Sequence, residues 1–147
     1  MRGIVEDRGQ ALIEFAMVLP VIVLLLVGIF DVGRAIQQES SLTAATREAT
    51  RYATVHGAQS SSPTGPNSAT YTAPSTDTAV NAVVQRFVTG INTALTISST
   101  WPDGNANRGS RVVVTATTPF QPLLSSFFGA GGLTITLRGS STLAIEQ

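Results

Sequence analysis

Glu14 is the residue for which the sequence most clearly demands a chemical explanation. It lies near the start of an apolar run from Ala11 to Phe30, and a helix of these 20 residues would be about 30 Å long, the depth of a bilayer's hydrocarbon. A carboxylate in lipid costs about 3 kcal/mol and usually has a partner. A cut between Gly9 and Gln10 would create a charged amine about one helical turn from Glu14. The amine of Gln10 could pair with Glu14 in the same chain or in a neighbouring subunit.

Other combinations of residues that could support chemistry are weak. The chain has one histidine, His56, and no cysteine, so no nucleophilic or metal site is predicted. The segment from Asp103 to Asn107 begins like a calcium-binding loop, but Arg108 stands where that loop needs glycine. Arg47, Glu48 and Arg51 are interpreted as a solvated helix face. We therefore predict no enzyme activity and no cofactor.

Nine arginines balance nine acidic residues, and no lysine is present. A nucleic-acid partner would require a basic stripe, which the sequence lacks, so such a partner is not expected.

The elements that must position Glu14 are one long helix and a small domain. The apolar run continues into residues 31–56, whose apolar positions recur at helical spacing. Pro20 is predicted to bend the membrane helix or loosen it locally, although proline is also tolerated in transmembrane helices without a special role. Gly57 is expected to end the helix, and His56 to lie at its carboxyl end.

The C-terminal part predicts a second helix and several strands. A Ser/Thr/Pro/Gly-rich linker is expected over residues 57–76, and a helix over 77–89, capped by Ser75, Thr76 or Asp77. Alternating apolar residues then indicate strands around Ile97, Val114 and Ile135, with Leu143 and Ile145 extending or pairing with the last. Phe127 and Phe128 are interpreted as packed on the sheet or as an exposed tip. The fold class is therefore α+β: a long N-terminal helix with a transmembrane half and an amphipathic half, a short helix and an antiparallel sheet of three to four strands.

The stretch from Gly9 through Glu14-Phe15 to Pro20, continued by Gly28-Ile29-Phe30-Asp31 and by Ala45 to Ala53, resembles the TadE-like minor pseudopilins of tight-adherence (Tad/Flp) type IV pilus systems. The resemblance implies a pilin-like fold and cleavage after Gly9 by a prepilin peptidase, with Gln10 as the new N-terminus and Glu14 and Phe15 as the processing and assembly motif. It implies a single-pass protein of the bacterial inner membrane, with a cytoplasmic N-terminus and an extracytoplasmic C-terminal domain. The implied function is a structural, priming or tip component of a pilus used for surface adherence. The implied partners are pilin and pseudopilin subunits, bound through the N-terminal helix, and the pilus assembly platform.

These features predict a leader over 1–9, a transmembrane helix over 10–30, an amphipathic helix over 31–56, a linker over 57–76 and an α+β domain over 77–147. Two other kinds of N-terminus remain open: a secretory signal peptide cut near Gly33-Arg34-Ala35, and an uncleaved single-pass anchor. The alternative function is a membrane-anchored binding domain that never assembles.

Overall fold

The chain folds into two compact units, each described here by itself. The computed structural model describes residues 3–74, 78–88, 91, 94–127, 129 and 133–146, with the backbone alone for 3–8 and 127. One unit comprises Met1–Arg34 and Gln121–Leu133, and the other comprises Ala35–Phe120 and Thr134–Gln147. The predicted domain boundaries, which divide the chain differently, stay a prediction.

Helix α1 extends over Gly3–Val55 and contains Pro20. It is long and apolar enough to cross a membrane, and the apolar window that meets this criterion has no buried residues. Met17, for example, exposes 74% of its surface. An apolar helix that the protein itself leaves uncovered suggests a single-pass membrane anchor.

The C-terminal half of α1 packs on the sheet through small side chains. Leu42, Ala45, Ala49 and Ala53 are fully buried, as the helical spacing predicted. Threonines at 46, 50 and 54 are buried beside them, although their polar side chains did not predict burial. Each of these hydroxyls donates to a carbonyl of its own helix, such as Thr50 Oγ1 to Thr46 O at 2.6 Å, so burial leaves no threonine donor unsatisfied.

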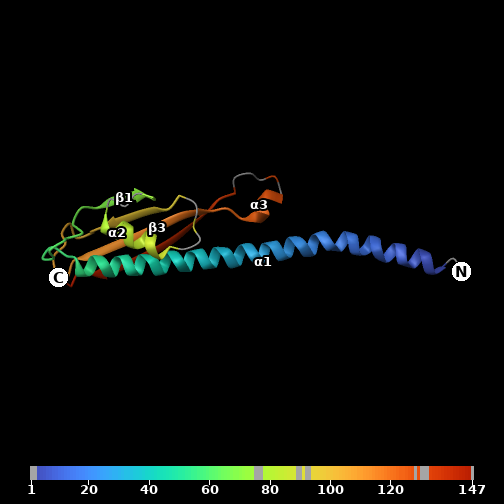
Figure 1. Cartoon of the computed structure of the whole chain (residues 1–147), viewed down its shortest axis with the longest axis horizontal. Helices are drawn as coiled ribbons and strands as arrows, with labels where there is room; N and C mark the ends of the chain where they lie inside the picture. Colours follow the sequence, from blue (N-terminus) through green and yellow to red (C-terminus); the bar gives the residue numbers. More distant parts are fainter. Residues whose placement is uncertain are drawn as a thin grey trace. The chain divides into compact units, whose positions relative to one another are not determined.

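Among the described residues, four strands form one antiparallel sheet in sequence order, β1 (Ala69–Thr72), β2 (Thr96–Thr100), β3 (Arg111–Phe120) and β4 (Ile135–Ala144). Along β3 alternate residues are buried, so one face of the sheet contributes to the core. That core also contains residues of α1 and α2 (Ala79–Phe87). Figure 1 shows α2 and the strands lying along the teal, C-terminal end of α1. The predicted α+β class is confirmed.

Three details differ from the sequence predictions. Strand β1 lies inside the stretch predicted to be an unstructured linker; it pairs with β2, with Tyr71 opposite Ile97. The N-cap of α2 is Thr78, whose side chain accepts from Asn81 N, while the predicted caps at 75–77 lie outside the described residues, as do 89 and 90 at the predicted end of this helix. Gly57 follows the end of α1 without a positive φ, so its left-handed freedom is not what ends the helix.

Candidate functional site

The predicted processing and assembly residues lie together near the start of α1. Gly9, Gln10, Glu14 and Phe15 are all helical and exposed. Gln10 and Glu14 are four residues apart, which places them on the same side of the helix, one turn from each other. Among the described residues, no hydrogen bond or ion pair involves Glu14. Within the described part of the chain, nothing prevents its carboxylate from meeting a group of another molecule.

The surface around Glu14 is apolar. The described side chains from Leu12 to Val23 are exposed, and the large apolar ones among them include Leu12, Ile13, Phe15, Met17, Val18, Leu19, Val21, Ile22 and Val23. Exposed apolar surface of this extent is normally covered by lipid or by another protein. A lone carboxylate in such surroundings is a strong reason to seek a cationic partner there.

Pro20 lies within this segment, and α1 continues past it. Because proline has no N–H, the carbonyl of Ala16 lacks its usual helical donor. The predicted bend at Pro20 stays a prediction.

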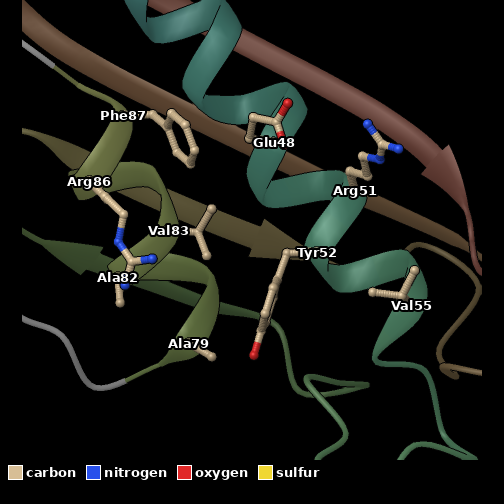
Figure 2. A pocket seen from close by; sticks show the side chains of 9 residues that line it. All are labelled: Glu48, Arg51, Tyr52, Val55, Ala79, Ala82, Val83, Arg86 and Phe87. Carbon is tan, nitrogen blue, oxygen red and sulfur yellow. The ribbon is translucent and has the colours of Figure 1, made fainter.

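A groove of about 440 Å³ separates the C-terminal end of α1 from α2. Figure 2 shows Tyr52 extending from α1 toward Ala79 of α2. The groove is lined by Glu48, Arg51, Tyr52, Val55, Ala79, Ala82, Val83, Arg86 and Phe87.

The charged residues of this groove are not paired with one another. Within the described chain, Glu48, Arg51 and Arg86 make no ion pair with one another or with other residues. The Tyr52 ring stacks on His56 at a centroid distance of 4.0 Å, and His56 Nδ1 lies 2.8 Å from Tyr52 O. His56 thus caps the end of α1, where the sequence placed it, and its described contacts serve the helix.

The loop between β2 and β3 uses its polar side chains to hold its own shape. Both carboxylate oxygens of Asp103 accept from Arg111, at 2.7 Å from Nη2 and 3.2 Å from Nε, and Oδ2 also accepts from the Arg111 backbone N–H. The hydrogen bond from the Arg111 side chain lowers the pKa of Asp103 to about 2. Asn105 Oδ1 accepts from Asn107 N and from the Ser110 hydroxyl. The side-chain oxygens of Asp103 and Asn105, two of the three residues that resembled calcium ligands, are therefore already engaged.

In the part of the chain that the structure describes, no cluster of three or more His, Asp or Glu side chains could hold a metal ion. Tertiary structure gives Asp31 a role that no sequence motif predicted. Asp31 is only 6% exposed; its Oδ2 accepts from Leu124 N at 2.8 Å, and its Oδ1 lies 3.5 Å from Arg34 Nη1. The sequence hints at a role for Asp31 only through its position, directly after the apolar run and three residues before Arg34.

Together these features define a class: an α+β protein with one N-terminal helix suited to anchoring it in a membrane, and with an exposed carboxylate on that helix. Residues 9–51 match the model of the family described as TadE-like protein. The resemblance predicted from the Gly9 to Ala53 motif is therefore confirmed, and the chain carries a TadE-like N-terminal segment. No curated protein and no solved structure gives a significant match to the chain.

Proposed function

We propose that this protein is a minor pseudopilin that primes, tips or otherwise contributes structurally to a Tad/Flp pilus. The TadE-like match suggests a component associated with the Tad pilus. The observation that carries the finer proposal is the exposed apolar surface of α1, which holds a carboxylate at Glu14 with no partner among the described residues. The match also begins at Gly9, the residue that precedes the proposed cut.

In this proposal a prepilin peptidase removes the leader after Gly9, and Gln10 becomes the first residue. The new amine of an incoming subunit pairs with Glu14 of its neighbour within the membrane. Because a lone carboxylate in lipid is costly, this pairing removes a penalty that each separate subunit carries. Subunit association is thereby favoured at the register in which the two charges meet, and Phe15 and the apolar residues beside it pack against the neighbouring helix.

The proposed precursor crosses the inner membrane once, with its N-terminus in the cytoplasm. Arg2 and Arg8 precede the span and Arg34 follows it, so the proposed cytoplasmic side has one arginine more than the other side. The sheet and α2 would then lie outside the cytoplasm. Because the chain has no cysteine, this domain would fold there without disulfides. The proposed partners are the peptidase, the other pilin subunits and the assembly platform.

The deciding experiment determines the N-terminus of the protein from cells that carry its processing machinery, by intact mass and terminal peptide sequencing. We expect the mature chain to start at Gln10 and expect Gly9→Val to retain the leader. Gly33→Val is the matched control, because a Cβ meets no atom within 4 Å at either glycine. The control should be processed normally.

Three results would contradict this function. A wild-type chain that starts at Met1 would favour an uncleaved anchor for a binding domain. A start at Ile36 would indicate signal-peptide cleavage. A chain that starts at Gln10 but never co-purifies with pili, even when pili are abundant, would argue against a role in the filament.

A further inference from the structure

The loop that joins β3 to β4, residues 121–133, belongs to the same compact unit as the N-terminal part of α1. It contains no charged residue; indeed, none occurs between Arg111 and Arg138. The short helix α3 (Leu123–Phe127) lies within it. A loop of this length on a water-facing surface would normally carry charge, whereas one that enters a bilayer must avoid it.

The loop contacts α1 at the residues that would lie in lipid. Leu124 lines an apolar groove of about 520 Å³ together with Leu24, Leu25, Gly28, Ile29 and Val32. If the hydrocarbon ends near Phe30, Leu24 lies six residues, or roughly 9 Å, inside it. The groove also includes Val32, beyond Phe30, so Leu124 lies beside the end of the apolar run, where the acyl chains meet the headgroups.

A polar contact fixes the loop at this depth. Asp31 accepts from Leu124 N at 2.8 Å and is almost fully buried. This hydrogen bond pairs a backbone N–H of the loop with the carboxylate at the end of the span. Because few water molecules reach this depth, either group would be costly to bury without a partner. Leu123 and Leu133 stay 47% and 58% exposed, so the loop keeps a free apolar surface.

We propose that the described residues of this loop, 121–127, 129 and 133, form a second membrane contact that enters the outer part of the bilayer beside α1, and that the apolar groove and the exposed leucines are covered by lipid acyl chains. The proposal rests on α1 crossing a membrane and does not depend on pilus assembly. The chain would then be attached to the bilayer at two points, so that rotation of α1 about its axis is restricted.

The natural absence of cysteine allows a direct test with single spin labels on the full chain. Leu123→Cys is labelled, and the protein is reconstituted in vesicles of phosphatidylethanolamine and phosphatidylglycerol. Relaxation by oxygen, which concentrates in lipid, is compared with relaxation by a water-soluble nickel chelate. Leu26→Cys, exposed in the span and outside the groove, is the lipid control, and Asn107→Cys in the exposed β2–β3 loop is the aqueous control.

We expect the oxygen-to-nickel ratio at Leu123 to lie several-fold above that at Asn107 and not above that at Leu26. A ratio equal to that at Asn107 would overturn the proposal. So would a label that both reagents fail to reach and whose spectrum broadens as protein-to-lipid ratio rises, because a second copy would then cover the groove. An aqueous ratio at Leu26 would show that α1 does not cross the bilayer, and would overturn this proposal whatever the pilus experiments show.

The role of Asp31 is tested in the same labelled chain. Asp31→Ala removes the acceptor and should move the ratio at Leu123 toward the aqueous control. Asp31→Asn keeps a side-chain oxygen that can accept from Leu124 N, so it should preserve the wild-type ratio. An unchanged ratio in Asp31→Ala would show that this contact does not hold the loop at its depth.

Discussion

Gly139 of β4 lies directly against the backbone of Leu42 in α1. A Cβ at position 139 would sit 2.6 Å from the carbonyl carbon of Leu42 and 2.8 Å from Thr43 N. These atoms belong to the helix backbone, which cannot turn aside as a flexible side chain could. The sheet and the helix therefore approach closely because position 139 has no side chain.

Gly139→Ala should destabilise this unit by about 1–3 kcal/mol, the usual range for overpacking. The measurement is urea unfolding of the full chain in detergent, followed by the fluorescence of Trp101, the chain's single tryptophan, which is buried. Thr142→Ala, at an exposed position of the same strand, is the control and should change the unfolding free energy by much less. If Gly139→Ala and wild type had equal unfolding free energies, the helix and the sheet could move apart at this point without a loss of stability.

The alanines of α1 make a second prediction. Ala49 is fully buried against the sheet, whereas Ala44 on the same helix is exposed. Leucine is a good helix former at either position, so the two substitutions differ mainly in packing. Ala49→Leu should lower the unfolding free energy by about 1–3 kcal/mol, and Ala44→Leu should leave it nearly unchanged in the same urea assay. Similar effects at both positions would contradict the assigned faces of the helix.

The ion pair of Asp103 and Arg111 predicts a dependence on acid. Because the folded-state pKa of Asp103 is lowered to about 2, below its usual value near 3.9, its stabilising contribution is present above about pH 4 and is lost as the pH falls toward 2. Arg111→Gln should raise the pKa of Asp103 toward its usual value, measured by carboxyl carbon NMR through a pH titration. Both groups are exposed, so the effect on overall stability should be small.

Arg108→Gln is the matched control, since Arg108 lies in the same loop and makes no ion pair within the described chain. It should leave the titration of Asp103 close to wild type. A pKa of Asp103 that does not move in Arg111→Gln would show that the arginine side chain is not what lowers it.

Glu14→Gln tests the proposed use of the carboxylate in assembly. An amide in the span is easier to insert than a carboxylate, so membrane insertion should be unimpaired, while loss of the charge should reduce incorporation into pili at least tenfold. The measurement compares the amounts of the protein in membranes and in sheared pili. Glu39→Gln, an exposed position farther along α1, is the control and should incorporate normally. Wild-type incorporation of Glu14→Gln would remove the role given to this residue.

The features that sequence predicted well depend on short stretches of chain. The apolar run, the helical spacing of Leu42, Ala45 and Ala49, and the alternation in β2 and β3 are local signals, because neighbouring residues share one element and one face. The motif from Gly9 to Phe15 is also local, which is why the TadE-like resemblance could be stated from the sequence and then confirmed.

Tertiary structure alone decided the features that join distant residues. Strand β1 has little apolar character of its own and forms by pairing with β2, so composition indicated only a linker. Three contacts join segments that are more than 90 residues apart. They are the hydrogen bond from Thr50 to Ser141 O, the close approach of Gly139 to Leu42, and the hydrogen bond from Leu124 N to Asp31. No local pattern encodes such a contact. Each contact forms only when folding brings the two segments together. Buried polar groups must then be hydrogen-bonded, which pairs Leu124 N with Asp31, and the interior must be close-packed, which places Gly139 against the backbone of Leu42.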